Sequence, residues 1–225
     1  MKRLAFIAIA AATMVASGQA IVITQWNFNA STTTPNVGAG TASLVGGATS
    51  PSFNSGVGSS DPIASGNLGW QTTTYPAQGT ANKTAGVQFL VSTVGFEDVT
   101  VSFDVRHSNT SSRFLQFQYS TDGSTWNDLG AALDHNLGDT WFNNNSFDLS
   151  SISAADNNAS FGLRVVTAFG PAGGYEASNP TGSYGTAGTL RYDMVTINGT
   201  QVVPEPATLA ALGLGAMALI RRKRK

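Results

Sequence analysis

The 225-residue sequence contains no cysteine and only two histidines. Without cysteine, the chain cannot form a disulfide framework, a thiolate metal site or a cysteine nucleophile. A zinc site usually needs three or four His or Cys ligands, whereas His107 and His135 stand 28 positions apart in the sequence. This composition argues against a zinc enzyme and excludes a cysteine hydrolase.

Charged residues are also scarce, at 11% of the chain. Seven of the twelve Lys and Arg residues lie within the first three and the last five positions. Between residues 21 and 203 there are five bases against twelve acids, a net charge of −7. Because affinity for nucleic-acid backbones depends on Lys and Arg, this acidic body predicts no nucleic-acid partner.

The first twenty residues have the features of an export signal. Two bases precede an apolar run from Leu4 to Ala16, and small residues follow it. This order predicts a secretory signal peptide over residues 1–20, cut between Ala20 and Ile21. An uncleaved N-terminal anchor is the alternative, for which the apolar run is short.

The last residues form a three-part tail. Pro204, Glu205 and Pro206 resist both helix and strand, because proline fixes φ and lacks an N–H donor. Residues 207–220 carry no charge, and residues 221–225 are all basic. The uncharged segment predicts a helix of roughly 21 Å, which spans a bilayer core of about 30 Å only with local thinning. The basic residues would hold the C-terminus in the cytoplasm; a buried core helix with a solvated tail is the alternative.

The order of these features over residues 203–225 resembles the PEP-CTERM sorting signal of Gram-negative bacteria. The resemblance implies export, transient anchoring in the inner membrane, and cleavage near Pro204–Pro206 by an exosortase-like protease. It further implies release or attachment at the cell surface or in the extracellular matrix. The three motif residues would be substrate for that protease and not catalytic residues of this chain.

The body over residues 21–202 alternates apolar and polar residues with the period of two that is typical of half-buried strands. Helical periodicity is nearly absent, apart from one turn within residues 150–159. The sequence therefore predicts an all-β sandwich of eight to twelve strands, flanked by a signal helix and a transmembrane helix. The strands are expected near residues 23–28, 87–91, 96–107, 112–120, 146–149, 161–169 and 190–199, with weaker candidates at 42–45 and around Phe53.

Two stretches, residues 30–86 and 170–188, are predicted as long irregular loops because they are rich in Gly, Ser, Thr and Asn. Asp122-Gly123 predicts a hairpin with a type I′ turn, with Trp126 closing the hairpin onto the core. Trp26 is also expected in the core.

The bend at residues 106–108, the hairpin of residues 115–126 and the last strand at residues 191–199 resemble the jelly-roll domain of secreted and PEP-CTERM bacterial proteins. This resemblance covers about residues 68–200. It implies a lectin-like β-sandwich and carries no agreed activity.

Several side chains are candidates for a binding site. Aromatic residues expected to be exposed for stacking on sugar rings are Trp70, Tyr75, Trp141, Tyr175 and Tyr184. Asp134 and Asp139 are candidate ligands for a structural calcium ion, because calcium prefers oxygen ligands. His107 and His135 are expected in solvent-exposed loops, and no nucleophile motif or marked carboxylate pair indicates catalysis.

The sequence thus predicts three domains: a signal peptide (1–20), a β-sandwich (21–202) and a PEP-CTERM sorting signal (203–225). We expect an exported, non-enzymatic surface or matrix protein with a structural or adhesive role linked to exopolysaccharide. A carbohydrate-binding module and an extracellular hydrolase are the alternatives.

Overall fold

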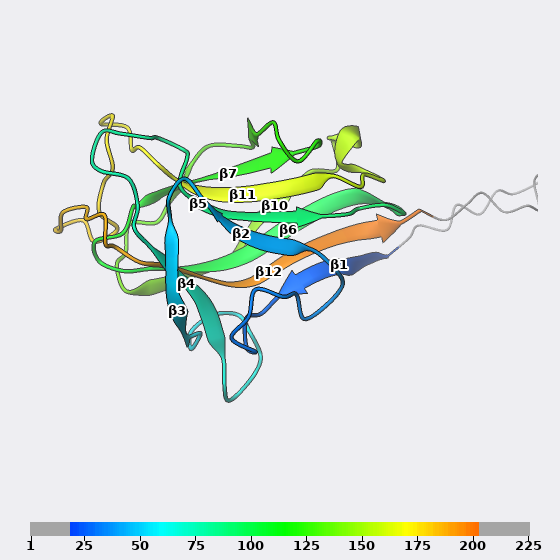
Figure 1. Ribbon diagram of the computed structural model, residues 1–225, viewed down its shortest axis with the longest axis horizontal. Helices are drawn as coiled ribbons and strands as arrows, with labels where there is room; N and C mark the ends of the chain where they lie inside the picture. Colours follow the sequence, from blue (N-terminus) through cyan, green and yellow to red (C-terminus); the bar gives the residue numbers. More distant parts are fainter. Residues whose placement is uncertain (1–18, 203–225) are drawn as a thin grey trace, which may run out of the picture. The chain divides into compact units, whose positions relative to one another are not determined.

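The computed structural model describes residues 19–202, which form two antiparallel β-sheets packed face to face (Figure 1). Residues 1–18 of the predicted signal peptide (1–20) and the sorting residues 203–225, including Pro204, Glu205 and Pro206, lie outside the described residues. Within residues 19–202, no helix is long and apolar enough to cross a membrane. The elements are β1 (Ala20–Trp26), β2 (Thr41–Val45), β3 (Thr49–Ser55), β4 (Leu68–Thr73), β5 (Gly86–Val91), β6 (Phe96–His107), β7 (Phe114–Ser120), β8 (Asn127–Asp128), β9 (Leu133–Asp134), β10 (Thr140–Asp148), the 3₁₀ turn η1 (Ser153–Ala155), β11 (Phe161–Ala168) and β12 (Leu190–Gln201).

The two sheets contain six strands each. Sheet A has the strand order β10-β6-β12-β4-β3, and β1 also pairs with β12. Sheet B has the order β2-β5-β11-β7-β8, and β9 also pairs with β7. Most neighbouring strands in both sheets are distant in sequence, so the chain crosses repeatedly from one sheet to the other. This connectivity is that of a jelly-roll sandwich, as predicted, and not of a simple meander.

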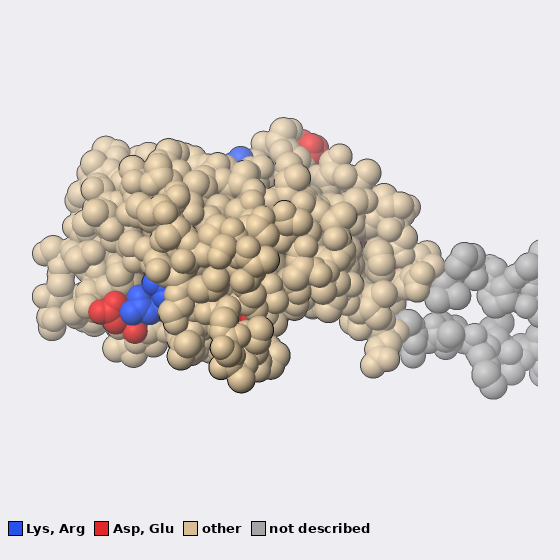
Figure 2. Space-filling model, turned by 60° about the horizontal axis from the view of Figure 1, so that its bottom comes forward, with Lys and Arg blue, Asp and Glu red and all other residues tan. Residues whose placement is uncertain are grey.

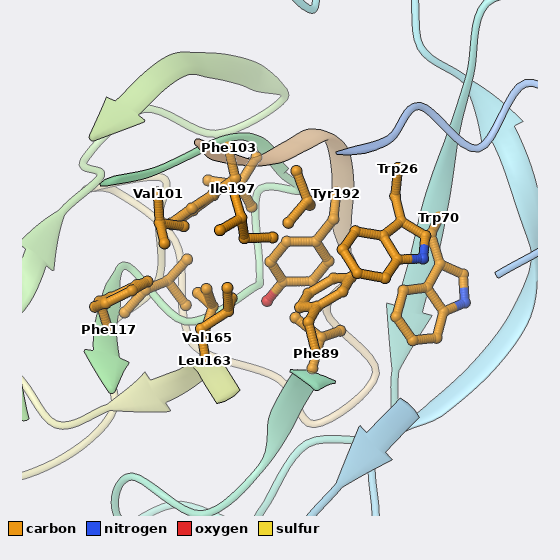
Figure 3. Packing of buried hydrophobic residues seen from close by; sticks show 14 of the residues in the cluster. Trp26, Trp70, Phe89, Val101, Phe103, Phe117, Leu163, Val165, Tyr192 and Ile197 are labelled. Carbon is orange, nitrogen blue, oxygen red and sulfur yellow. The ribbon is translucent and has the colours of Figure 1, made fainter. Parts of the chain in front are cut away.

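The core lies between the sheets and follows the predicted alternation. On β6, Val99, Val101, Phe103 and Val105 are at most 1% exposed. The facing strands of sheet B supply residues such as Phe117, Leu163 and Val165 (Figure 3), which come from β7 and β11. Burial of one face of each sheet against the other is the main stabilising term of such a sandwich.

The first long loop predicted from the sequence was wrong in one part, because residues 68–73 form strand β4. β4 pairs with β12 and β3, which places Trp70 in the core at 3% exposure. Its ring lies near Phe28 and Phe89, and its Nε1 donates to Ser50 Oγ. The sequence did not predict this strand because it contains Gly69, and glycine is depleted in strands.

The hairpin after β7 exists, but its turn is not type I′. Gly123 has a positive φ of 74°, whereas Asp122 is absent from the residues with positive φ. Instead, the Asp122 carboxylate accepts hydrogen bonds from the backbone N–H groups of Ser124 and Thr125, at 2.8 and 2.6 Å. These bonds organise a longer loop and hold the pKa of Asp122 well below its usual value.

The two ends of the described body meet on neighbouring strands (Figure 1). Ala20 pairs with Thr200, and Ile21 pairs with Gly199. The predicted signal cleavage site and the connection to the sorting segment therefore leave the sandwich at the same end.

Candidate functional site

A row of polar side chains crosses the outer face of sheet B, the face that points away from the core. Strand pairing aligns one residue from each of five neighbouring strands in this row, which we call the polar row. Its members are Ser43, Gln88, Arg164, Gln118 and Asp128. At about 4.8 Å between strands, the row extends over roughly 19 Å.

Hydrogen bonds hold the long side chains of the polar row in place. Arg164 Nε donates to Gln88 Oε1 at 2.8 Å, and Gln118 Nε2 donates to Asp128 Oδ1 at 2.9 Å. Lys83 also forms an ion pair with Asp128 at the edge of the sheet. The planar amide and guanidinium groups are therefore fixed before any ligand arrives.

Trp126 lies beside the polar row and not in the core, so the prediction that it closes the hairpin onto the core is wrong. The Arg164 Cζ atom lies 3.8 Å from the centroid of the Trp126 ring. Gly162 makes room for that ring, because a Cβ there would lie 2.9 Å from Trp126 Cη2. Burial beneath its neighbours lowers the pKa of Arg164 from its ordinary value.

A hollow of about 450 Å³ lies at this end of sheet B. Leu90 contributes apolar surface to it, and Ser160 and Asp122 contribute polar groups. Leu90 also borders the space beside Gly162 that Trp126 approaches. The outer face of sheet B therefore combines a polar row, an aromatic ring and a neighbouring depression.

Two of the predicted sugar-contacting residues come together at another place. The rings of Tyr175 and Tyr184 stack with centroids 4.7 Å apart, in a hollow of about 360 Å³ that also includes Arg113 and Glu176. Tyr175 is only 2% exposed and donates to Ala81 O, so its expected exposure is wrong. Tyr184 stays partly exposed and donates to Pro76 O.

The other predicted aromatics are separate from this hollow. Trp70 and Tyr75 are 3% and 4% exposed, so the expectation that their rings are exposed is also wrong. Trp141 is partly exposed on β10, at an edge of sheet A. Its Nε1 donates to Val57 O, and its ring lies against Gly58, whose φ of 101° disfavours any other residue.

The two histidines are buried and in contact, which corrects the expectation that they lie in exposed loops. His107 is 0% exposed at the end of β6, and His135 is 5% exposed after β9. Phe142 stacks on the His135 ring with centroids 4.2 Å apart. Burial lowers the pKa of His135 to about 4 and that of His107 well below its usual value.

The carboxylates proposed for calcium are each paired with an arginine. Asp134 accepts two hydrogen bonds from Arg113, and Asp139 accepts one from Arg106. These ion pairs neutralise the charge that a calcium ion would need at Asp134 and Asp139. Within residues 19–202, no three His, Cys, Asp or Glu side chains are placed to hold a metal together.

A second pair of carboxylates carries no counter-charge. Asp104 on β6 and Asp193 on β12 are directly opposite each other and are 1% and 0% exposed. None of the four ion pairs of the described residues includes either carboxylate. Burial, together with the nearby charges of Asp61 and Asp104, raises the pKa of Asp193 to about 7.

The alternation of residues placed Asp104 on the wet face of its strand and gave no sign of Asp193. The members of the polar row also alternate with core residues, so their outward direction was predictable. What the sequence could not provide is the register that brings Gln88, Arg164 and Gln118 side by side.

Comparison with solved structures finds β-sandwich domains. A xylan-binding CBM22-1 domain of Paenibacillus barcinonensis Xyn10C is 16% identical, with a TM-score of 0.48, covering 83% of this chain and 98% of that domain. The CBM22-1–CBM22-2 tandem domain of the same protein is 15% identical, with a TM-score of 0.50, covering 86% of this chain and 50% of the tandem. A mannan-recognising module, TmCBM27, is 11% identical, with a TM-score of 0.46 and coverages of 81% and 99%. The likeness to the tandem domain shows a shared fold.

No curated protein matches the chain. Residues 202–225 match the family model described as the PEP-CTERM protein-sorting motif, which confirms the prediction made from the tail. The chain therefore carries a PEP-CTERM sorting motif at residues 202–225 and has an all-β sandwich body over the described residues 19–202.

Proposed function

We propose that this chain is the precursor of an exported surface protein whose β-sandwich binds a polysaccharide on the outer face of sheet B. The observation that carries this proposal is the polar row beside Trp126. Sugar hydroxyl groups both donate and accept hydrogen bonds, which amide and guanidinium groups fixed in register can satisfy. A row of roughly 19 Å is long enough for several sugar rings.

The surface chemistry supports an uncharged ligand. On the one face of the molecule that Figure 2 draws, charged side chains occupy only small areas, as their 11% share of the chain leads one to expect. On sheet B, Arg164 is engaged by Gln88 and stacks on Trp126, while Lys83 is paired with Asp128. A neutral polysaccharide suits such a face better than a polyanion, which would need unpaired bases. The solved tandem domain that shares this fold is named as a carbohydrate-binding module, which supports the same class of ligand.

The sorting motif supports the route to the surface. In this proposal the signal peptide is cut between Ala20 and Ile21, and residues 207–220 anchor the precursor transiently in the inner membrane of a Gram-negative bacterium. An exosortase-like protease then cuts near Pro204–Pro206. The product is attached at the cell surface or released into a matrix that contains exopolysaccharide.

A non-enzymatic role fits the placement of the carboxylates better than hydrolysis does. Glycosidases place two carboxylates on either side of an accessible glycosidic bond. The facing pair of Asp104 and Asp193 is buried, and backbone N–H groups of Ser60 and Asn144 already donate to Asp104. A polysaccharide chain cannot reach a pair in this position.

Affinity electrophoresis in gels that contain xylan, mannan, β-glucan or the host's own exopolysaccharide tests the binding face. We expect at least one polysaccharide to retard the processed protein, and Trp126→Ala or Arg164→Ala to abolish that retardation. Trp141→Ala, on sheet A, and Tyr184→Ala, in the Tyr175–Tyr184 hollow, are the matched aromatic controls. If only a control variant abolishes the retardation, the polysaccharide binds at the surface that contains the substituted control residue. The proposal for sheet B would then be wrong.

Intact mass of the protein recovered separately from envelope and medium tests the processing. We expect the loss of residues 1–20 and of the residues beyond the Pro204–Pro206 region. A mass that retains residues 207–225 would instead indicate a permanently anchored protein.

A further inference from the structure

The loop between β3 and β4 covers two buried carboxylates on the outer face of sheet A. Residues 56–67 form this loop, and Ser59 Oγ donates to Asp193 Oδ2 at 2.6 Å. The backbone N–H of Ser60 donates to Asp104 Oδ2 at 2.5 Å. Two facing anions under one loop repel each other, so burial without a compensating charge is costly.

A third oxygen points into the same place and has no hydrogen-bond partner. Asn67 is 8% exposed, and its Oδ1 is buried and unpaired. Its Nδ2 donates to Ser59 Oγ, which fixes the direction of the amide. Buried carbonyl oxygens are nearly always paired, so an unpaired one beside the Asp193 carboxylate indicates a place for a cation or another donor.

Glycine at position 56 leaves the space in which Asn67 Oδ1 approaches the Asp193 carboxylate. A Cβ on Gly56 would lie 1.8 Å from Asn67 Oδ1 and 3.0 Å from Asp193 Oδ2. The loop also borders an open hollow of about 390 Å³, lined in part by Ser59, Asp61 and Asn67. A small ion can therefore enter from solvent.

Bulges on both neighbours of β6 shape the site. The pairing of β10 with β6 shifts near Asn144, whose φ is 56°, and its N–H donates to Asp104 Oδ1 at 2.7 Å. The pairing of β12 with β6 shifts near Met194, whose φ is 47°, and its N–H donates to Asp193 Oδ1 at 2.7 Å. The left-handed conformation is unfavourable for Met194, whereas asparagine adopts it more readily; such conformations and bulges often accompany functional sites.

We infer that Asp104, Asp193 and Asn67 form a binding site for Ca²⁺ that the loop of residues 56–67 closes. Two carboxylates and an amide oxygen are hard ligands, and Ser59 Oγ, loop carbonyls and water would complete the six to eight oxygens that calcium prefers at about 2.3–2.6 Å. The bound ion would offset both buried charges and satisfy Asn67 Oδ1. It would also fix the loop over sheet A, and this role does not depend on polysaccharide binding.

Thermal unfolding of the full-length chain in detergent, after treatment with EGTA, tests the site. We expect Ca²⁺ at about 100 times its Kd to raise the Tm by about 5 to 10 °C, and Mg²⁺ at equal concentration to raise it much less. Asp193→Asn should fold, because it removes a buried charge, and it should lose the calcium shift. Asp139→Asn, a carboxylate paired with Arg106 outside the site, should keep the shift.

Terbium luminescence gives a readout that does not depend on stability. Tb³⁺ binds calcium sites, and Trp141, which lies against Gly58 of the loop, should sensitise its emission. We expect emission from the unaltered chain that Ca²⁺ displaces, and none from Asp193→Asn. The inference is overturned if Ca²⁺ leaves the Tm unchanged, if Mg²⁺ acts equally, or if Asp193→Asn retains the shift or the emission. In another outcome, Asp193→Asn raises the Tm in EGTA while calcium has no effect on the unaltered chain. This result would overturn the inference and show that Asp104 and Asp193 share a proton instead.

Discussion

His135 Nδ1 lies 2.9 Å from His107 Nε2 inside the protein, and the hydrogen bonds around the pair determine both tautomers. Asn145 Nδ2 donates to Phe103 O and Phe142 O, so Asn145 Oδ1 must accept from His135 Nε2. Neutral His135 then accepts at Nδ1 from His107 Nε2, so His107 Nδ1 carries no proton; it lies 3.3 Å from Ser111 Oγ, whose hydroxyl donates to Ser108 O at 2.9 Å. Both rings are therefore neutral with the proton on Nε2, and protonating His135 would set two N–H groups against each other.

The hydrogen-bonded series Asn145–His135–His107, which we call the relay, predicts loss of stability in mild acid. Both histidines have pKa values in the folded protein below the usual 6.5, so the unfolded chain binds more protons as the pH falls below that value. Their contribution to stability is complete above pH 6.5 and is lost as the pH falls toward 4. The slope can reach about 1.4 kcal/mol per pH unit for each histidine. Urea unfolding at pH 7.5, 6.5, 5.5 and 5.0 measures it.

His135→Gln provides the comparison, because the chain has only these two histidines. We expect the variant to be less stable at pH 7.5 and to show a shallower dependence on pH down to 5. The carboxylates are unchanged between the two proteins, so their titration cancels in the difference. Parallel pH profiles would contradict the neutral relay.

The alternation of residues in single strands predicted the layers of this fold well. Every second residue from Val99 to Val105 and from Phe161 to Val165 faces the core as expected, because a period of two needs no information from outside the strand. The functional surfaces depend instead on pairing between distant strands. Gln88 and Arg164 are hydrogen-bonded across 76 positions, and nothing in either segment specifies that register.

Burial by loops was the second feature that the sequence did not reveal. Asp104 occupies an outward position on β6, where alternation predicts solvent, but the loop of residues 56–67 covers it. His107 and His135 looked like exposed polar residues at strand ends, whereas Phe142 and the relay bury them. A loop that folds back on a sheet leaves no periodic signal in the sequence.

Trp70 should be a packing residue and not a sugar-contacting one. We expect Trp70→Phe to lower the free energy of unfolding by about 1–3 kcal/mol, because it removes the hydrogen bond to Ser50 and part of the contact with Phe28 and Phe89. Any retardation by polysaccharide should persist at temperatures where the variant is folded. Urea unfolding and affinity electrophoresis measure the two effects, and a loss of binding in the folded variant would contradict this role.

Arg113 should couple two loops at the end of the sandwich. Its guanidinium binds Asp134 through Nε and Nη2 and Glu176 through Nη1. Lysine cannot reproduce this fork, so we expect Arg113→Lys to cost about 0.5–1.5 kcal/mol and to increase hydrogen exchange at residues 170–188. Lys83→Arg, at the exposed pair with Asp128, is the matched control. Unchanged exchange in that loop would show that Arg113 does not hold it.

At position 194, glycine should be more favourable than alanine, which is the reverse of their usual order within a strand. The φ of Met194, 47°, is unfavourable for any residue with a Cβ and costs nothing extra for glycine. Substitution by alanine and by glycine removes nearly the same side chain, and the alanine variant retains the conformational strain. We therefore expect Met194→Gly to be more stable than Met194→Ala by about 1 kcal/mol in urea unfolding with EGTA present. If alanine were equally or more stable, the bulge beside Asp193 would not require the left-handed conformation.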